Sequence, residues 1–404
     1  MRSRTASTTR SLREVDVPLG PDVLERVLPA VETALSGGPA LLPLPADPPS
    51  VRDALLAPMR PDVAVEDAGD PVALVVPTSG STGQPKGVLL GGRALRASAA
   101  RTYARLGGPG RWLLALPATH VAGLMVLVRS IVAGTEPVAI DLHAGFAAKS
   151  FLAAAGRLFR GDGLPRYTSL VPRQLNAVVE AGGAALEALT SFDAVLVGGS
   201  AIPPVLLERA RATGVRLVTS YGMTETCGGC VYNGVPLDGV RVETTADRRV
   251  RIAGPVLAHG YRLRPDLTAA AFRDGWFTTS DLGRMDDTGR LHIFGRMDDV
   301  AVSGGVNVPL PAVDELLAQH PAVAAAAAVA VPDADWGQRI VAAVVAADPA
   351  VPPSLESIRA HVLRTAPAAY APKSVLVVDA LPVSASGALD RAQLAARLAA
   401  STAR

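Results

Sequence analysis

An apolar run, residues 73–76, leads into the segment Thr78-Ser79-Gly80-Ser81-Thr82-Gly83-Gln84-Pro85-Lys86-Gly87. Its ten residues contain three glycines and four hydroxyl side chains, which supply bare backbone N–H groups and hydroxyl donors. Such a loop suits a polyphosphate, and Lys86 adds a positive charge. It is not a Walker A loop, because that motif places its lysine between a glycine and a hydroxyl residue, whereas Lys86 lies between Pro85 and Gly87.

Outward from this loop, short apolar strands alternate with helical stretches as far as about residue 220. The predicted strands are residues 73–76, 112–116, 169–171 and 194–197, and helices are predicted over 121–132 and after Pro203. This alternation indicates a mostly parallel sheet covered on both faces, with ligands at the carboxyl ends of the strands. The position of the loop inside such a domain favours a binding loop over a flexible serine- and glycine-rich linker.

The pattern changes after Gly239. Residues 240–262 alternate with period two, which predicts a small antiparallel subdomain. Beyond Arg296, a glycine-rich hairpin is followed by predicted helices at 312–319 and 355–363 and strands at 322–331, 340–346 and 374–378. We therefore predict an α/β protein. Its large N-terminal domain, residues 1–296, has layered, mostly parallel sheets and the antiparallel subdomain, and residues 297–404 form a small, mobile α+β domain.

Composition excludes several classes of protein. The chain has 404 residues, a net charge of +2 and scattered arginines, so no strong field recruits nucleic acid or an anionic membrane. The longest apolar run, residues 322–331, is too short to cross a bilayer. The arginine- and serine-rich N-terminus suits a transit peptide, but we favour a frayed tail. A soluble, cytoplasmic protein is expected.

The two cysteines, Cys227 and Cys230, have the spacing CGGC. A redox pair or half of a zinc site would use this spacing. However, no second Cys/His pair follows at zinc spacing, and the pair does not sit at a thioredoxin-like strand-to-helix turn. We expect two reduced thiols that line a pocket.

The loop at residues 78–87 resembles the phosphate loop of the adenylate-forming superfamily, which includes acyl- and aryl-CoA ligases, luciferases and peptide-synthetase adenylation domains. The resemblance extends from about residue 72 to residue 391. It includes Tyr221-Gly222-Met223-Thr224-Glu225, which matches the family's Y-G-x-T-E. The resemblance implies that the loop binds ATP phosphates, Tyr221 stacks on adenine, Thr224 contacts the α-phosphate and Glu225 holds Mg²⁺. A hard carboxylate suits that ion.

Further segments match the family in the expected order. Gly198-Gly199-Ser200 resembles the segment that lies against adenine, and Thr278-Thr279-Ser280-Asp281 matches the T-x-D motif. The resemblance implies that Asp281 accepts the two ribose hydroxyls and that Arg296 lies near the ribose and phosphate. It also makes Asp298 the hinge about which the small domain swings. Ser303-Gly304-Gly305 resembles the loop that admits coenzyme A, whose pantetheine passes close to glycine backbone.

Several segments look like the o-succinylbenzoate–CoA ligase subgroup of menaquinone biosynthesis, and the short N-terminal region agrees with it. They are residues 116–124, 128–137, 169–175, 227–232 and 302–308. The resemblance implies a small aromatic carboxylic acid with one carboxylate activated and a second held deep in the pocket. The candidate substrate-binding residues are His120, Arg173, Cys227 and Gly228. A structural histidine and a solvated arginine at a helix start are the alternatives for His120 and Arg173.

One departure concerns the family's C-terminal motif, G-K-x-D-R, whose lysine bridges the carboxylate and the α-phosphate during adenylation. Here the segment reads Gly387-Ala388-Leu389-Asp390-Arg391. A methyl group cannot stabilise the charge that develops as the carboxylate attacks phosphorus, so we expect Ala388 to impair adenylation. An engineered Lys→Ala change and a natural loss would both explain it.

Three hypotheses follow. The favoured one is a two-step ligase that uses ATP, Mg²⁺ and coenzyme A, with Lys86, Thr224, Glu225 and His120 as its catalytic residues. The second is the same chemistry on another aryl or acyl acid, and the third is a nucleotide-binding pseudo-enzyme. An amino-acid adenylation domain is disfavoured, because no carrier domain follows Arg391. The family also leads us to expect a homodimer.

Overall fold

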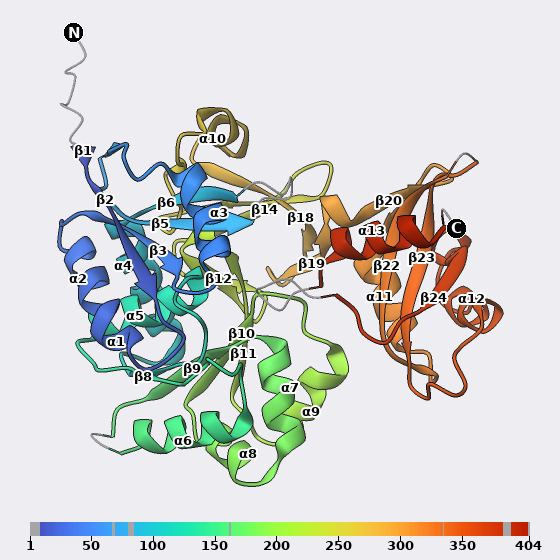
Figure 1. Cartoon of the computed structure of the whole chain (residues 1–404), viewed down its shortest axis with the longest axis horizontal. Helices are drawn as coiled ribbons and strands as arrows, with labels where there is room; N and C mark the ends of the chain where they lie inside the picture. The colour runs from blue at the N-terminus through green and yellow to red at the C-terminus, as the bar shows by residue number, and fades with distance from the viewer. Residues whose placement is uncertain are drawn as a thin grey trace. The chain divides into compact units, whose positions relative to one another are not determined.

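The computed structural model describes residues 9–66, 69–79, 85–160, 163–333, 335–382 and 389–402 (Figure 1). The chain forms two compact units. Unit 1 consists of Met1–Glu243, Arg251–Thr278 and Asp287–Leu291, and unit 2 consists of Thr244–Val250, Thr279–Asp286 and His292–Arg404. In the described part of the chain, no helix is both long and apolar enough to cross a membrane.

The first sheet of unit 1 carries the phosphate loop. Its strand order is β16 (Gly260–Tyr261), β6 (Pro85–Gly91), β5 (Val72–Ser79), β3 (Ala40–Pro45) and β2 (Leu12–Val17). Strands β2, β3 and β5 are parallel, whereas β6 runs antiparallel to both β5 and β16. The predicted strand at 73–76 thus extends to Ser79, and the loop closes a β-hairpin rather than leading into a helix.

The second sheet of unit 1 is the predicted parallel one. Its order is β13 (Val235–Pro236), β12 (Gly228–Tyr232), β11 (Leu217–Met223), β10 (Ala194–Gly198), β9 (Arg166–Leu170), β7 (Arg111–Leu114) and β8 (Val138–Ala139). The five strands from β8 to β11 are parallel, and β12 and β13 continue the sheet antiparallel. These two sheets confirm the predicted α/β fold with layered, mostly parallel sheets.

Three helices lie between the two sheets: α2 (Leu28–Leu35), α4 (Gly92–Leu106) and α5 (Val121–Ala133). Helix α2 contacts β3 and β5, α4 contacts β5, β6 and β12, and α5 contacts β7, β9 and β12. All residues of α5 from Gly123 to Ser130 are buried, as expected for a helix that is apolar all round. This layer of helices therefore joins the two sheets of unit 1 and sets the distance between them.

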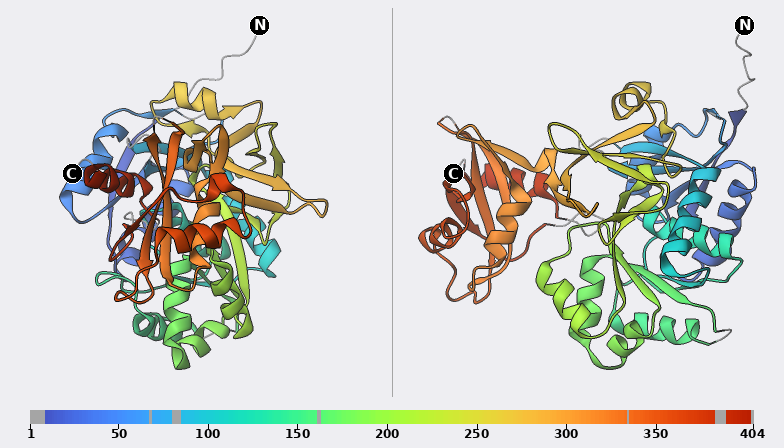
Figure 2. Two further views of the ribbon diagram at one scale, coloured as in Figure 1. Left: turned by 90° about the vertical axis from the view of Figure 1, so that its right-hand side faces the viewer. Right: turned by 180° about the vertical axis from the view of Figure 1, so that it is seen from behind.

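The remaining helices of unit 1 cover the outside. A core that includes Phe151, Leu175 and Leu189 packs α6 (Ala148–Leu158), α7 (Pro172–Ala181) and α8 (Gly183–Thr190) against the seven-stranded sheet, and these teal and green helices lie together in Figures 1 and 2. The other helices are α1 (Val23–Arg26), α3 (Pro49–Met59), α9 (Pro204–Ala212) and α10 (Pro265–Ala271), and β1 (Thr9–Arg10) pairs with β4 (Val65–Glu66).

The period-two region forms a separate sheet with the order β14 (Arg241–Thr244), β15 (Arg249–Ala253), β18 (Trp276–Met285) and β17 (Phe272–Arg273), and with β19 (Leu291–Arg296) beside β18. Buried and less buried residues alternate along β18, as the pattern predicts for a half-buried strand. The division between the two units falls within these strands.

The main sheet of unit 2 has the order β21 (Val306–Pro309), β20 (Val300–Ser303), β23 (Gly337–Ala346) and β22 (Val323–Asp333), and β24 (Ser374–Val377) pairs parallel with β23. One face packs on α11 (Leu310–Ala318) and α12 (Leu355–Leu363). The other face packs on α13 (Arg391–Thr402), drawn in dark red in Figure 1. The helices and strands expected beyond residue 300 are all present, with ends no more than three residues from the predicted ones. The domain boundary at residues 296 and 297 stays a prediction.

Candidate functional site

The base of the phosphate loop is a pair of hairpin residues, Thr78 and Lys86, which lie opposite each other on β5 and β6. The Thr78 hydroxyl donates to the Lys86 carbonyl over 3.3 Å, so the hydroxyl belongs to the base of the hairpin. Of Ser79 only the backbone is described, and Gly80, Ser81, Thr82 and Gly83 lie outside the described residues. The structure therefore fixes where the loop begins and ends.

Lys86 and Glu225 form an ion pair, although 139 positions separate them in the chain. The Lys86 Nζ lies 3.2 Å from Glu225 Oε1, and the Glu225 side chain is only 9% exposed. A third residue, Tyr261, completes the cluster: its hydroxyl donates to the same Oε1 over 2.8 Å, and Lys86 Nζ lies 4.0 Å from its ring centroid. Burial and the Glu225 carboxylate raise the pKa of Tyr261, so the phenol remains a protonated donor.

Glu225 is held by a single 3₁₀ turn, η1 (Thr224–Thr226), at the end of β11. Its carbonyl accepts the Ala258 N–H over 2.8 Å. Buried Thr226 fastens the turn, because its hydroxyl accepts the Met223 N–H over 3.0 Å and donates to the Gly228 carbonyl over 2.7 Å. The carboxylate thus projects from a rigid turn.

The donors present fit Mg²⁺ that is shared with a polyphosphate. Among the described residues, no three His, Cys, Asp or Glu side chains gather as a metal site. Mg²⁺ usually takes one or two carboxylates and completes its shell with phosphate oxygens and water. One buried carboxylate, Glu225, beside the base of a phosphate loop meets that requirement.

The segments predicted to hold adenine come together at the carboxyl ends of β10 and β11. These strands are parallel neighbours, and Gly198 lies opposite Ser220, next to Tyr221. Gly199 and Ser200 are exposed beyond the end of β10, and Tyr221 is half-buried. α/β sheets bind ligands outside the carboxyl ends of their strands, so the structure brings these predicted residues to a suitable place.

Gly222 must be a glycine for a local reason. A Cβ atom at this position would lie 2.1 Å from the Gly228 carbonyl oxygen on the neighbouring strand β12. The pairing of β11 with β12 is also irregular between Tyr221 and Gly222. The close approach of the two strands therefore holds the turn that carries Thr224 and Glu225.

His120 begins helix α5, where it serves as the N-cap residue with extended backbone. Its side chain is exposed, yet surrounding protein atoms desolvate the ring and lower its pKa. Arg173 is an exposed residue in the first turn of α7. The structure thus gives His120 a crowded position and leaves the Arg173 guanidinium accessible.

The two cysteines are fully buried free thiols. Burial raises the pKa of Cys230 to about 12 and also raises the pKa of Cys227. Cys227 has a left-handed backbone after η1, and its carbonyl accepts the Ser98 hydroxyl over 2.9 Å. These thiols are protonated at neutral pH, and neither is exposed at a surface. Next to them, Gly228 lies beside Met125 of α5.

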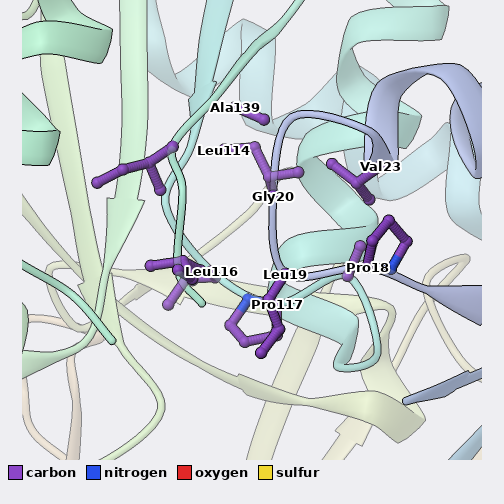
Figure 3. A pocket seen from close by; sticks show the side chains of 11 residues that line it. Pro18, Leu19, Gly20, Val23, Leu114, Leu116, Pro117 and Ala139 are labelled. Atoms are coloured by element: carbon purple, nitrogen blue, oxygen red, sulfur yellow. The ribbon is translucent and has the colours of Figure 1, made fainter. Parts of the chain in front are cut away.

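A small apolar cavity lies at the end of β7 (Figure 3). Leu114, Leu116 and Pro117 form one side, and Pro18, Leu19 and Val23 from the N-terminal segment form the other. Its volume is about 10 Å³, room for a single water molecule. An aromatic acid does not fit this cavity.

In unit 2, two residues that are predicted to lie at the ribose, Asp281 and Arg296, form an ion pair. Arg296 Nη1 lies 3.3 Å from Asp281 Oδ1, and Asp281 is 8% exposed. Thr279 supports the aspartate, because its buried hydroxyl accepts the Asp281 N–H over 2.9 Å and donates to the Val250 carbonyl. A carboxylate held in this way is suited to accept hydroxyl groups.

The Ser303-Gly304-Gly305 segment is the turn of the β20–β21 hairpin. Gly304 and Gly305 have φ angles of +58° and +78°, which favour glycine. The Gly304 N–H donates to the Trp336 carbonyl over 3.0 Å, and Lys373 Nζ lies 3.7 Å above the Trp336 ring. Sequence reasoning did not identify Trp336, because no motif marks the tryptophan as a neighbour of the hairpin.

Two further predicted residues are described only in part or not at all. Asp298 lies in η2 (Met297–Asp299), where its backbone alone is described, and Ala388 lies outside the described residues. Arg391, three positions after Ala388, pairs with Asp299 at 3.2 Å and also with Asp314. These ion pairs fix the segment that follows Ala388 to the residue after Asp298.

Comparison with known proteins agrees with this geometry. Residues 13–264 match the family described as AMP-binding enzyme, and residues 312–388 match its C-terminal domain. A protein named "Probable 2-succinylbenzoate--CoA ligase" from Mycobacterium tuberculosis (strain CDC 1551 / Oshkosh) is 45% identical over 393 residues, which covers 96% of this chain and 99% of that protein.

The solved structures include o-succinylbenzoate CoA synthetase (MenE) from Bacillus subtilis in complex with the acyl-adenylate intermediate OSB-AMP. It matches with a TM-score of 0.73 and 28% identity over 91% of this chain and 80% of that chain. The same synthetase with ATP and a magnesium ion matches with a TM-score of 0.72 and 27% identity, covering 91% and 81%. The chain therefore belongs to the family of AMP-binding, adenylate-forming enzymes.

Proposed function

We propose that the chain is an ATP-dependent acid–CoA ligase that converts 2-succinylbenzoate (o-succinylbenzoate) to its CoA thioester, with release of AMP and pyrophosphate. The observation that carries the proposal is the ion pair at the base of the phosphate loop, where half-buried Lys86 and buried Glu225 lie 3.2 Å apart. It joins a cation suited to phosphate with a hard carboxylate suited to Mg²⁺. The identity with a ligase of that name supports the choice of acid.

We assign each part of the nucleotide to residues that the sequence predicts. Residues 78–83 and Lys86 hold the phosphates, with Thr224 on the α-phosphate. Tyr221 to Met223 and residues 198–200 flank adenine. Asp281 accepts the ribose hydroxyls beside Arg296, which already contacts that carboxylate. Bound Mg²⁺, with Glu225 as its ligand, would neutralise phosphate charge as pyrophosphate leaves.

Two half-reactions follow from this assignment. First, a carboxylate oxygen of the acid attacks the α-phosphorus, and the bond from that phosphorus to the pyrophosphate oxygen breaks. Then the thiolate sulfur of coenzyme A attacks the acyl carbon, and the bond to the AMP oxygen breaks. Ser303, Gly304 and Gly305 admit the pantetheine, and Asp298 is the hinge for the small domain, residues 297–404, between these steps.

The acid would lie near the start of α5. His120, whose lowered pKa keeps the imidazole neutral at pH 7, lines the acyl site. Gly228 and Cys227 are both buried and would lie behind the residues that touch the acid, and the exposed guanidinium of Arg173 is our candidate partner for the carboxylate that is not activated. Because that carboxylate is charged, Arg173→Gln should raise the KM for 2-succinylbenzoate while leaving the affinity for ATP unchanged.

The experiment that tests the function restores the missing lysine. Ala388→Lys should increase ATP–pyrophosphate exchange with 2-succinylbenzoate by about 10²–10³, the range measured for a lost charge-stabilising donor. A panel of other aryl and acyl acids serves as the control for substrate choice. If exchange does not rise, Ala388 is not the lesion. If another acid is preferred, the substrate assignment is wrong.

A pseudo-enzyme predicts a different result, namely ATP binding without transfer of preformed acyl-adenylate to coenzyme A. The ligase, in contrast, should carry out that transfer even with Ala388 in place, because the second half-reaction does not use the lysine. A homodimer and a cytoplasmic location belong to the same proposal and are tested by sedimentation and by cell fractionation.

A further inference from the structure

Tyr261 contacts both charged groups of the nucleotide site but belongs to none of the motifs that identify the site. It lies on the short strand β16, opposite Val88 of β6, and is 6% exposed. We propose that Tyr261 is a positioning residue that orients Glu225 through its hydroxyl and Lys86 through its ring. The inference rests on the proposed binding of magnesium and ATP at this site.

The hydroxyl accounts for the direction of the carboxylate. Tyr261 Oη donates to Glu225 Oε1 over 2.8 Å, and Lys86 Nζ lies 3.2 Å from the same oxygen. A buried carboxylate needs such donors to offset the loss of water. Because Tyr261 and Lys86 both contact Oε1, they hold the Glu225 carboxylate in one orientation and leave Oε2 for another ligand. Partners that orient a metal ligand in this way commonly change metal affinity when they are removed.

The ring accounts for the direction of the ammonium group. Lys86 Nζ lies 4.0 Å from the centroid of the Tyr261 ring, within the range of a cation–π interaction. Lysine has a long, flexible side chain, so a partner on the ring face reduces the conformational entropy that is lost when a phosphate binds. The ring and the hydroxyl thus act on different charged groups.

Tyr261 itself is held rigidly. Its N–H donates to the Thr268 hydroxyl over 2.9 Å, and its ring meets Phe272 edge to face with centroids 5.7 Å apart. The next residue, Arg262, donates to the backbone carbonyls of Met59, Arg60 and Val63. Strand pairing, packing and these bonds place the phenol before any ligand arrives, which is what a positioning residue requires.

Two substitutions separate the two roles. Tyr261→Phe removes the hydroxyl and keeps the ring, whereas Tyr261→Leu removes both the hydroxyl and the ring face. Tyr103→Phe is the matched control, because Tyr103 is also buried and its hydroxyl donates to a backbone carbonyl, that of Arg129, over 2.7 Å. The control loses the same atom together with two buried hydrogen bonds, one to the Arg129 carbonyl and one from Trp112 Nε1 over 3.0 Å, without touching Lys86 or Glu225.

The experiment is calorimetric titration of the full chain with ATP, in EDTA and over a series of Mg²⁺ concentrations. For Tyr261→Phe, the Mg²⁺ concentration at half-maximal enhancement of ATP binding should rise about tenfold, the lower end of the range for partners of metal ligands. Its affinity for ATP in EDTA should stay within about twofold of the wild type, because the ring still contacts Lys86. Tyr261→Leu should weaken binding in both conditions, and Tyr103→Phe in neither.

The inference is overturned if Tyr261→Phe keeps the wild-type dependence on Mg²⁺, or if it weakens ATP equally with and without Mg²⁺. If the wild type itself shows no Mg²⁺-dependent binding of ATP, the proposed function fails, and the inference fails with it. Circular dichroism checks that each variant is folded. Should Tyr261→Leu not fold, the comparison of Tyr261→Phe with Tyr103→Phe still decides the role of the hydroxyl.

Discussion

His320, in unit 2, is a buried imidazole whose two nitrogens have different partners. Its Nδ1 accepts the Ala322 N–H over 3.2 Å, so its Nε2 carries the proton and donates to Ser357 Oγ over 2.8 Å. Burial lowers the pKa of His320, and the nearby His361 ring and the Arg364 guanidinium lower it further. Protonation would remove the acceptor for the Ala322 N–H and add a positive charge near the Arg364 guanidinium.

The stability of unit 2 should therefore fall at acidic pH. Above the unfolded pKa of about 6.5, the imidazole is neutral in both states. Below it, the unfolded chain takes up the proton more readily, so the free energy of unfolding decreases as pH falls through 6.5 towards the lowered pKa. His320→Gln keeps a donor and an acceptor but does not titrate. Urea unfolding at pH 7.5 and pH 5.0 should show a decrease smaller by about 1 kcal/mol in this variant.

The matched control is His143→Gln, which removes an exposed histidine that pairs with Asp141. Exposed pairs contribute little to stability, so this variant should keep the wild-type difference between the two pH values. An equal decrease in His320→Gln and in the wild type would mean that another group causes the acid sensitivity.

Some residues of the candidate site can be identified from the sequence, and others only from the folded structure. Lys86 lies in a loop whose composition indicates phosphate binding, and the metal role of Glu225 is implied by the resemblance to the adenylate-forming family, so the sequence is sufficient to select both. Tyr261 and Thr226 act through contacts that only the folded chain creates: β16 pairs with β6 across more than 170 positions, and Thr226 bonds within a turn. A tyrosine in an alternating segment gives no sign of which side chain it meets.

At the scale of elements, a substitution at Gly222 tests whether the close approach of β11 and β12 holds the turn that carries Glu225. Gly222→Ala would place Cβ 2.1 Å from the Gly228 carbonyl oxygen, so the strands must separate. We expect a loss of about 2–3 kcal/mol in the free energy of unfolding and a large loss of ATP binding, because the turn with Glu225 moves. Denaturant unfolding and calorimetry measure the two effects.

The control is the same substitution in an open position. Gly156 lies exposed within α6, and a Cβ there would meet no atom within 4 Å. Gly156→Ala should stabilise the chain by about 0.5–1 kcal/mol, since alanine loses less backbone entropy in a helix. If the two variants changed stability alike, crowding between β11 and β12 would not be the reason for the glycine.

Helices and strands could be predicted from the sequence where it contains a continuous apolar run. The apolar runs at residues 73–76 and 194–197 and the apolar helix from residue 121 appear in the structure as β5, β10 and α5, because burial follows periodicity. The antiparallel partner of β5 was not predicted. Residues 85–91 contain proline, lysine and glycine, which are poor strand formers, and tertiary pairing with β5 and β16 overrides that preference.

At the scale of the whole molecule, the predicted residues are distributed over two compact units. Lys86, Tyr221 and Glu225 belong to unit 1, whereas Asp281, Arg296 and the Ser303–Gly305 turn belong to unit 2. Unit 2 has its own apolar cores on both faces of its sheet. In the proposed reaction, the Ser303–Gly305 turn serves only the second step, whereas Lys86 and Glu225 serve the first. The two half-reactions should therefore respond separately to substitutions.

That separation can be measured with Gly304→Ala in the Ala388→Lys background. Gly304 has φ +58°, and a Cβ there would lie 2.8 Å from the Trp336 ring, so alanine must strain or shift the hairpin turn. A penalty of about 1–2 kcal/mol for the left-handed conformation corresponds to a rate change of about tenfold. We expect transfer of acyl-adenylate to coenzyme A to slow by about that factor, while ATP–pyrophosphate exchange stays unchanged.

Gly289→Ala is the matched control, because Gly289 has φ +76° with no atom within 4 Å of its Cβ position. It introduces the same backbone strain in a turn for which no role is proposed, so both half-reactions should keep their rates. If Gly304→Ala slowed exchange as much as transfer, the hairpin would have a general structural role and no specific role in the second step. Loss of transfer alone would assign it to the second step, the step that Ala388 leaves intact.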